Sequence, residues 1–555
     1  MKIFWYSPYE GVQSQQQVRD SITRSIFLAP AYFYIKTAYE ELGEETPLEW
    51  TVPIFDFIED NEVRLQAEDS KLFCISVYPW NIEKLKVLTS TLSDEGFFND
   101  KFLLVGGPGC DDFLLTHKHL VDYACFGDGE QGFIDIIRDI TGKTRLNPIS
   151  TVNIAYKRGE EFIRTQSAFI KRKHTASPWV NQKELLSRVL EHYKTKYSSV
   201  NFVAPWETGR GCPYQCTFCD WTKSQSSGNK VFKFQHKLTD DLDTFHDLGI
   251  THLLLADANF GLWDSDLDLI DHMCKLKVEK DSKLGIFNTN LSKNKKHNIK
   301  KMFEKLIKFR IPMVFKFSVQ DTHKEVLDAI RRPDITWEAH REMLLGFKQL
   351  IKDTGDKSDP PFMVEIILGL PNQTFDSWAE TVFHIIDPGF APRMYLLHDI
   401  INAPIALDTE YRQEWQIKSK VLRFEEGSTY TPKIVVSTKT YTEDDWTDML
   451  ALSKIVQNLM MLRSQELIHV SGEQLVEAAK EIVKMAPVKF ASSKMANRLK
   501  GPEEFIDLSE ENARQTIATF GAIHSYFGFE DEHRKTIYEL FFGTAAGQGG
   551  GLLAF

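Results

Sequence analysis

Three cysteines lie within eight residues of one another, in the sequence GRGCPYQCTFCDW. Cys212, Cys216 and Cys219 have the spacing C-x3-C-x2-C. Thiolates at this spacing, on a loop that follows an apolar strand, can bind three irons of a [4Fe–4S] cluster and leave the fourth iron without a protein ligand. An open coordination position is typical of a catalytic metal centre. The motif therefore predicts a chemically active iron–sulfur site.

Two other kinds of metal site compete for the same motif. A structural zinc site needs a fourth ligand nearby, whereas the next cysteine, Cys274, stands alone in a helical pattern. A closed electron-transfer cluster also needs a fourth cysteine close to the first three. A disulfide framework does not fit, because seven cysteines in 555 residues are few and odd in number.

The composition is that of a globular protein large enough for several domains. Hydrophobic residues make up 42% and charged residues 26%, which excludes disordered and collagen-like classes. The formal net charge of −12 favours neither a nucleic-acid partner nor an anionic membrane. The first residues lack a signal-peptide pattern, and the strongest apolar stretch, FLAPAYFYI, is shorter than the ~18 residues of a membrane span. We therefore expect a soluble, cytoplasmic protein without a membrane or nucleic-acid partner.

Apolar runs and amphipathic stretches alternate in residues 1–145. Strands are expected at 2–6, 71–78 and 102–107, and helices at 26–42, 81–92 and 131–140. This pattern predicts an α/β, doubly wound (flavodoxin/Rossmann-like) domain with a parallel sheet. Ligands of such sheets bind at the carboxyl ends of the strands, where the sequences SVYPWN, GGPG and FGDGEQGF follow.

The rest of the chain divides into three parts. Residues 146–198 are polar and predict a linker, with a basic KRKH stretch at 171–174. Residues 199–430 predict a partial (β/α) TIM-like barrel, with chemistry at the carboxyl ends of its strands. Residues 431–555 carry helical periodicity and predict a C-terminal α-helical domain with a flexible tail at 543–555. Barrel strands are expected at 251–257, 284–290, 313–319, 363–371 and 393–400.

The segment CPYQCTFC, with Phe218 before its third cysteine, resembles the signature of the radical S-adenosylmethionine (SAM) superfamily. The resemblance implies that the open iron chelates the amino and carboxylate groups of SAM. It also implies that the reduced cluster cleaves SAM to a 5′-deoxyadenosyl radical, with electrons from a partner such as flavodoxin or ferredoxin. The resemblance thus implies that Phe218 is a cofactor-binding residue and that the three cysteines are metal ligands.

Two segments behind the cysteines extend the resemblance. LLLADANFG, at 253–261, resembles the strand end that meets the methionine amino group of SAM, with Asp257 and Asn259 where the family has Gly-Gly-Glu. IFNTNLS, at 286–292, resembles the strand that binds the ribose, which makes Asn288 or Asn290 its expected partner.

Two further segments complete this set. FSVQDTHKEVLDAIRR resembles the next strand and helix, with Gln320 facing the site and Arg331 or Arg332 near the SAM carboxylate. VEIILGLPNQT resembles the strand whose Gly-x-Pro, Gly369 and Pro371 here, lets adenine lie against backbone.

The N-terminal domain resembles the cobalamin-binding domain of the B12-dependent radical SAM branch. Ser76, Gly106 and Gly107 match positions that admit the nucleotide tail of the cofactor, and we expect these glycines and Gly369 to tolerate no large side chain. The Asp-x-His-x-x-Gly motif that supplies an axial histidine is missing, because the first histidine of the chain is His117. We therefore expect cobalamin to bind without a histidine from residues 1–116. The alternative is a vestigial or substrate-binding flavodoxin-like domain.

Cys74, Cys110 and Cys125 suggest a second cluster of the kind that methylthiotransferases carry. Cys74 lies inside an apolar strand, however, and buried cysteine often behaves as a small hydrophobic residue. We therefore favour the interpretation of the three cysteines as small buried hydrophobic residues over that of cluster ligands.

The leading hypothesis is therefore a cobalamin-dependent radical SAM methyltransferase that acts on an unactivated carbon or another poor nucleophile. Its cofactors would be a [4Fe–4S] cluster, SAM and cobalamin, and its substrate a small molecule or a peptide. The alternative enzymes are a cobalamin-free radical SAM oxidoreductase and a methylthiotransferase. The non-enzyme alternative is a metal-stabilised scaffold that binds nucleotide or RNA.

Overall fold

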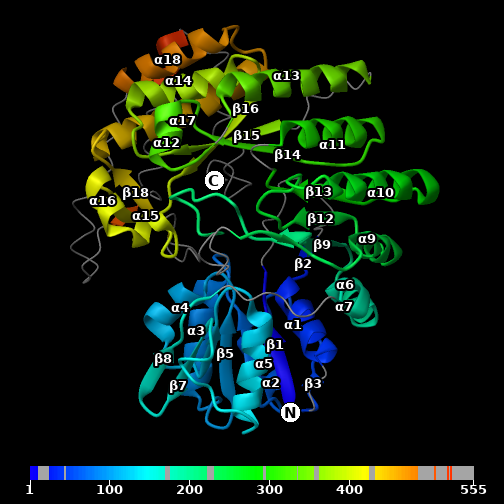
Figure 1. The fold of residues 1–555 in the computed structure, drawn as a ribbon. Helices are drawn as coiled ribbons and strands as arrows, with labels where there is room; N and C mark the ends of the chain where they lie inside the picture. The colour runs from blue at the N-terminus through cyan, green and yellow to red at the C-terminus, as the bar shows by residue number, and fades with distance from the viewer. Residues whose placement is uncertain are drawn as a thin grey trace. The chain divides into compact units, whose positions relative to one another are not determined.

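The computed structural model describes two compact units of the chain (Figure 1). Unit 1 comprises Met1–Gln215 and Asp220–Val314, and unit 2 comprises Cys216–Cys219 and Phe315–Phe555. The described residues are 1–9, 24–42, 46–168, 176–221, 230–291, 295–333, 335–354, 362–423, 432–485, 505–507, 522–523 and 525–527.

A seven-stranded sheet forms the first part of unit 1. Its strands are β1 (Lys2–Tyr6), β3 (Glu49–Trp50), β4 (Leu72–Ser76), β5 (Phe102–Gly106), β6 (Tyr123–Cys125), β7 (Ile154–Arg158) and β8 (Glu161–Arg164). Their spatial order is β3-β1-β4-β5-β6-β7-β8, parallel as far as β6 and antiparallel beyond it. By position along the chain the five parallel strands have the order 2-1-3-4-5, which is the flavodoxin-like doubly wound arrangement. The predicted fold class is confirmed for this domain.

Helices cover both faces of this sheet because successive residues of a strand point to opposite sides. The helices are α1 (Pro30–Glu41), α2 (Asp60–Ala67), α3 (Ile82–Asp94), α4 (Cys110–His117) and α5 (Gly129–Ile140). Phe4 and Phe73 pack in one core with residues of α2, α3 and α4. Trp5, the residue after Phe4 in β1, lies on the other face and contacts Tyr32 of α1 and Phe133 of α5.

A second parallel sheet of unit 1 has the order β13-β12-β9-β2. Its strands are β2 (Arg24–Phe27), β9 (Val200–Trp206), β12 (His252–Leu255) and β13 (Gly285–Asn288). The helices that follow or flank them are α6 (Pro178–Asn181), α7 (Lys183–Lys196), α9 (Leu238–Asp247), α10 (Ser265–Lys280) and α11 (Lys296–Lys308). A short antiparallel pair, β10 (Gly209–Arg210) with β11 (Phe232–Lys233), lies beside the cysteine motif in the sequence.

Two expectations for unit 1 were wrong. The helix expected at 26–42 begins only at Pro30, because proline disfavours helical geometry in the residue before it and is well placed at the first helical position. The preceding residues form β2, which pairs with β9. The segment 146–198, expected as an irregular linker, contains the hairpin β7–β8 and helices α6 and α7. The KRKH stretch lies outside the described residues.

Unit 2 contains a three-stranded parallel sheet in the order β14-β15-β16. The strands are β14 (Phe315–Gln320), β15 (Phe362–Leu368) and β16 (Ala391–Leu396), and the helices between and after them are α12 (Lys324–Ala329), α13 (Trp337–Asp353), α14 (Phe375–Ile386), α15 (Pro404–Leu407) and α16 (Thr409–Trp415). The alternation of parallel strands with helices is that predicted for a partial (β/α) barrel.

The C-terminal part of unit 2 is helical, as predicted, but not entirely. The helices are α17 (Glu443–Ser464) and α18 (Gly472–Met485). A small sheet is also present, with β17 (Lys418–Arg423) and β18 (Lys433–Ser437) before the helices and β19 (Phe505–Asp507) after them. The expected tail at 543–555 lies outside the described residues. None of the helices that the structure describes is long and apolar enough to span a membrane.

Candidate functional site

The cysteine motif begins directly after β10. Gly211 has φ of +91°, and a Cβ atom there would lie 1.9 Å from the carbonyl oxygen of Lys230, so only glycine lets the two segments pass this closely. Cys212 and Cys216 are buried and Cys219 is partly buried. The amide of Cys219 donates a hydrogen bond to the carbonyl of Cys216 at 3.2 Å, which closes a turn across the C-x2-C spacing.

The structure divides the three cysteines between its units. Cys212 belongs to unit 1, and Cys216 and Cys219 belong to unit 2. Within the described part of the chain, no group of three or more His, Cys, Asp or Glu side chains is arranged to hold a metal ion. The three-thiolate cluster site therefore stays a prediction.

Asn259, in the loop after β12, lies against the first cysteine. Its Nδ2 donates a hydrogen bond to Cys212 Sγ at 3.2 Å. Its Oδ1 is buried and receives no hydrogen bond from any residue that the structure describes. A buried acceptor without a donor costs about 1–3 kcal/mol, which a ligand with an N–H group would recover. The site thus fits the predicted contact between Asn259 and the SAM ammonium group, which stays a prediction.

Asp257 lies in the same loop, but its carboxylate bonds to the chain itself. Its Oδ2 accepts from the Thr208 amide at 2.9 Å and its Oδ1 from the Thr208 hydroxyl at 2.7 Å. Burial raises the pKa of Asp257 to about 7, although Lys233 and Thr208 act in the opposite direction. Since both oxygens have donors, Asp257 fixes the chain between β9 and β10 in this structure. Its predicted role toward SAM is untested.

Lys233 of β11 extends this buried network. Its Nζ donates to the Thr208 hydroxyl at 2.6 Å and pairs with Asp266 at the start of α10. Asp266 Oδ2 in turn accepts from the Gly261 amide at 2.8 Å. Sequence reasoning missed Thr208, Lys233 and Asp266, because the partners come from separate elements and no spacing links them.

The loop after β13 carries the two asparagines expected near the ribose. The side chain of Asn288 lies outside the described part of the structure. Asn290 is exposed, and its carbonyl accepts from the Phe260 amide at 2.8 Å, which joins the loops after β12 and β13. Between them, Thr289 has a buried hydroxyl without a hydrogen-bond partner among the described residues.

Arg210, directly before the cysteine loop, binds three carboxylates. Its Nη2 lies 2.8 Å from Glu207 Oε2, and its Nη1 lies 3.0 Å from Asp128 Oδ1 and 3.0 Å from Glu130 Oε1. Glu130 begins α5 together with Gly129, so the contact ties the cysteine loop to the loop after β6 of the seven-stranded sheet. The sequence FGDGEQGF was expected to meet a ligand; in the structure two of its acidic side chains hold Arg210.

Ser76 and Gly106 end neighbouring strands of the seven-stranded sheet. Ser76 is buried, and a Cβ at Gly106 would find no atom closer than 3.9 Å. Gly107 is different, because its φ is +95° and a Cβ there would lie 2.6 Å from the Val77 carbonyl oxygen. The chain itself therefore requires glycine at 107, whereas the prediction attributed it to a cofactor. The contacts of all three residues with cobalamin stay predictions.

Aromatic side chains gather where the winding direction of this sheet reverses, between β1 and β4. Tyr78 and Trp80 stack with ring centroids 4.5 Å apart, and Phe27 and Tyr9 lie 5.6 and 5.5 Å from Trp80. Ser7 directly follows β1 there, and its buried hydroxyl has no hydrogen-bond partner among the described residues. We call Ser7, Tyr9, Phe27, Tyr78 and Trp80 the switch-point cluster. Ligands of doubly wound sheets bind at this position.

Unit 2 holds the remaining predicted residues. Gln320 ends β14 with φ of +70°, and its buried Oε1 has no partner among the described residues. Phe218 packs against the core around α12 and α16. Arg332 is buried and donates to the Ser318 carbonyl, whereas Arg331 is exposed and lies 3.4 Å from Asp408. Their predicted contacts with SAM remain untested.

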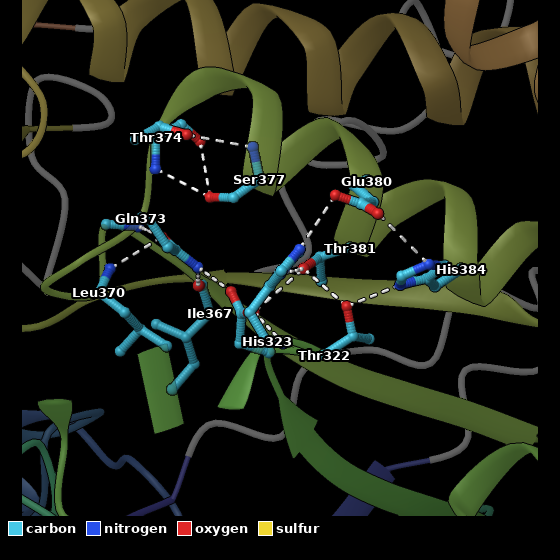
Figure 2. Close-up of polar contacts among 12 residues, drawn as sticks. Thr322, His323, Ile367, Leu370, Gln373, Thr374, Ser377, Glu380, Thr381 and His384 are labelled. Atoms are coloured by element: carbon cyan, nitrogen blue, oxygen red, sulfur yellow. Dashed lines mark hydrogen bonds and ion pairs between the residues drawn. The ribbon is translucent and has the colours of Figure 1, made fainter. Parts of the chain in front are cut away.

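Gly369 and Pro371 follow β15 in a loop that hydrogen bonds within unit 2 hold in place. Figure 2 shows Leu370 and Gln373 of this loop. The Gly369 amide donates to Gln373 Oε1 at 2.8 Å, and the Gly369 carbonyl accepts from the Tyr441 hydroxyl at 2.5 Å. The amide of Leu370 also donates to Gln373 Oε1, at 2.9 Å. Gln373 therefore sets the backbone on which adenine is expected to lie.

A buried carboxylate connects this loop to the end of β14. Asp321 Oδ2 accepts from Gln373 Nε2 at 2.7 Å, and its Oδ1 accepts from the His323 ring at 3.0 Å and from the Thr381 hydroxyl at 3.1 Å. His323 Nε2 also pairs with Glu380 Oε2 at 3.1 Å. Figure 2 marks this pair with a dashed line. The hydrogen bond to Asp321 raises the pKa of His323 to about 9. Near neutral pH, His323 is thus a cation between two carboxylates.

Part of the chain matches a known protein family. Residues 206–385 match the model of the radical SAM superfamily. The chain is 25% identical over 426 residues to 2-(S-pantetheinyl)-carbapenam-3-carboxylate methyltransferase of Streptantibioticus cattleyicolor, and 24% identical over 427 residues to the cobalamin-dependent radical SAM methyltransferase TokK of Streptomyces tokunonensis. Each alignment covers 73% of this chain and 59% of the relative, so the chain spans under two thirds of the length of these curated relatives.

Solved structures share the fold. The cobalamin-dependent SAM radical enzyme OxsB, with aqua-cobalamin and SAM bound, gives a TM-score of 0.60 at 12% identity over 98% of this chain and 84% of that one. TsrM of Kitasatospora setae, with cobalamin and a [4Fe–4S] cluster bound, gives 0.52 at 13% identity over 75% and 80%. Residues 206–385 thus carry a radical SAM domain, and the resemblance inferred from the sequence, to the B12-binding branch of the radical SAM superfamily, is confirmed.

Proposed function

We propose that this protein is a cobalamin-dependent radical SAM methyltransferase that methylates an unactivated carbon, or another poor nucleophile, of a small molecule. The observation that carries the proposal is the joint presence in unit 1 of two ligand-binding elements. One is a doubly wound sheet with an aromatic switch-point cluster, and the other is the strand end that sets Asn259 against Cys212. The two methyltransferases that the chain resembles support it.

The cysteine loop fits an iron–sulfur cluster with bound SAM. Cys212, Cys216 and Cys219 would hold the cluster, and the unpartnered Asn259 Oδ1 would accept from the SAM ammonium group. Asn259 Nδ2 already donates to Cys212 Sγ, and such a hydrogen bond stabilises the thiolate form and tunes the potential of a cluster.

The switch-point cluster fits a large planar cofactor such as cobalamin. Four aromatic rings offer apolar surface, and the buried Ser7 hydroxyl has no hydrogen-bond partner among the described residues. The neighbouring strand ends carry Ser76 and Gly106, the positions that the resemblance assigns to the nucleotide tail of the cofactor, and a Cβ atom at Gly106 would lie no closer than 3.9 Å to another atom. Because residues 1–116 contain no histidine, they would leave cobalt without an imidazole ligand.

When bound, the cluster and SAM supply a deoxyadenosyl radical that removes a substrate hydrogen atom, and the corrinoid supplies the methyl group. The protein's part is to fix these groups and keep water out. Arg210 serves that purpose by tying the cysteine loop to the doubly wound sheet through Asp128 and Glu130. The electrons would come from flavodoxin or ferredoxin, and a cytoplasmic location would provide such a donor.

Anaerobic reconstitution with iron, sulfide and hydroxocobalamin tests the proposal. After removal of free cofactor, we expect about one corrinoid per chain, and 5′-deoxyadenosine formation with dithionite and SAM that Cys216→Ala abolishes. Cys274→Ala is the matched control, because Cys274 is buried in α10 outside the motif and should retain activity. A protein that cleaves SAM but retains no corrinoid would be a cobalamin-free radical SAM enzyme instead.

A further inference from the structure

One face of the β14-β15-β16 sheet is polar and the other is apolar. Phe317 and Val364 lie on the apolar face, which is fully buried, and Phe317 stacks on Phe347 of α13. Successive residues of a strand alternate between faces, so their neighbours in sequence lie on the side away from this helix. Those neighbours are only partly buried. We call the following residues the polar face: Lys316, Ser318, Glu365, Arg393 and Tyr395.

Two hydroxyl groups donate hydrogen bonds to Glu365, the one carboxylate of the polar face. Ser318, Glu365 and Arg393 lie in register across the three strands. Glu365 Oε2 accepts from the Ser318 hydroxyl at 2.6 Å, and Oε1 accepts from the Tyr395 hydroxyl at 3.3 Å. Burial and the Glu365 charge raise the pKa of Tyr395 to about 12, so Tyr395 stays a neutral donor.

Arg393 has no carboxylate partner among the described residues, although Glu365 is its neighbour in register. Among the described residues, its Nη1 donates to the Met363 thioether sulfur at 3.5 Å, and its guanidinium carbon lies 5.3 Å from the centroid of the Tyr395 ring. Its Nε is buried and has no acceptor in the described structure. Guanidinium groups removed from water normally pair with an anion, because an unpaired buried charge is strongly unfavourable. The buried Nε of Arg393 therefore calls for an anionic acceptor that the described residues do not supply.

The surroundings of Arg393 keep the polar face positive. Lys316 and Arg393 carry two positive charges against the single negative charge of Glu365. Burial lowers the pKa of Lys316, while Glu365 acts against that shift. At the end of β14, Gln320 is 8% exposed and its Oε1 is a further unpartnered acceptor among the described residues. One bound anion would balance the charge, and a neighbouring donor group would satisfy Gln320.

We infer that the polar face binds the carboxylate of the substrate, with Arg393 as its principal cationic partner and Lys316 as the second. A guanidinium presents parallel N–H groups that match the two oxygens of a carboxylate. Arg393 lies three residues before the end of β16, about 10 Å along the strand from the carboxyl end where SAM is expected. The inference rests on the proposed function only in taking the bound molecule to be the methyl acceptor.

The test uses trifluoroacetate as a carboxylate probe of the full-length, cluster-reconstituted protein, followed by ¹⁹F NMR titration. We expect one saturable site in the wild-type protein, at least tenfold weaker binding in Arg393→Met, and an intermediate effect in Arg393→Lys. Arg341→Met is the matched control, because Arg341 is exposed on α13 and its loss changes the net charge equally. Trifluoroethanol, which has the same CF3 group without the charge, should not bind at this site.

Each outcome decides the inference. Absence of a saturable site in the wild-type protein, or equal binding by Arg393→Met and Arg341→Met, would overturn it. Displacement of the probe by saturating SAM would assign the face to the SAM carboxylate and overturn the substrate assignment. If Arg393→Met does not fold, as judged by its melting curve, Lys316→Met replaces it. Probe binding needs no corrinoid, so a protein that binds the probe but retains no corrinoid refutes only the proposed function.

Discussion

The charged network around Asp321 should make the stability of the protein depend on pH. The pKa of His323 is raised to about 9 from an ordinary value of 6.5. The stabilisation from this charge is therefore complete below pH 6.5 and is lost as the pH rises through 9. A pKa shift of that size corresponds to about 3 kcal/mol of stability. Because His323 is partly exposed, solvent screening reduces this contribution to about 1–2 kcal/mol.

Asp321→Asn is the perturbation that tests this reasoning. The new amide cannot accept all the hydrogen bonds from His323, Thr381 and Gln373. Its NH2 group would also face one or more of these hydrogen-bond donors. We expect a loss of about 3 kcal/mol at pH 6.5, since hydrogen bonds to charged groups contribute about 1.5–3 kcal/mol each. Because Gln373 holds the amides of the loop after β15, the affinity for SAM should fall as well.

The assay is thermal unfolding between pH 6 and pH 9.5, with SAM affinity measured by calorimetry at each pH. The wild-type melting temperature should decline from pH 6.5 to pH 9, whereas Asp321→Asn should melt lower and with a much flatter profile. Glu380→Gln is the control, because Glu380 is 58% exposed and its loss should change little. A variant at Asp321 with the wild-type pH profile would refute the assignment of the titration to His323.

Two further predictions concern unit 1. Gly107→Ala should destabilise the protein by at least about 2 kcal/mol in thermal melts, because its φ of +95° and the nearby Val77 carbonyl oxygen oppose a side chain. The control variant Gly106→Ala should destabilise it by under about 1 kcal/mol. Equal melting temperatures would contradict this difference. Asn259→Ala should weaken SAM binding about tenfold in equilibrium dialysis while the iron content is unchanged, and unaltered affinity would show that its Oδ1 does not meet SAM.

Features with local signals were predictable from the sequence. The cysteine motif depends on spacing over eight residues, and the strands of the doubly wound sheet are short apolar runs bounded by polar or glycine-rich segments. The doubly wound, parallel character of the sheet followed from the alternation of strands and helices, whereas the order of its strands came from the structure. Asn259 was singled out because its segment, LLLADANFG, resembles the radical SAM strand end that meets the methionine amino group, and its role toward SAM stays a prediction.

Features that depend on pairing between distant segments were not predictable. β2 is four residues long, and it is a strand because it pairs with β9, more than 170 residues later. The Asp321 network joins residues 52 and 60 positions apart. Gly107 was expected to be a ligand contact, because its close approach to Val77 cannot be read from a linear chain.

The most direct test of the central claim is electron paramagnetic resonance of the reconstituted protein after one-electron reduction of bound hydroxocobalamin. We predict about one Co(II) spin per chain, because the proposed function requires one bound cobalamin. A protein that carries the iron–sulfur cluster but shows no cobalt signal would contradict a cobalamin-dependent methyltransferase.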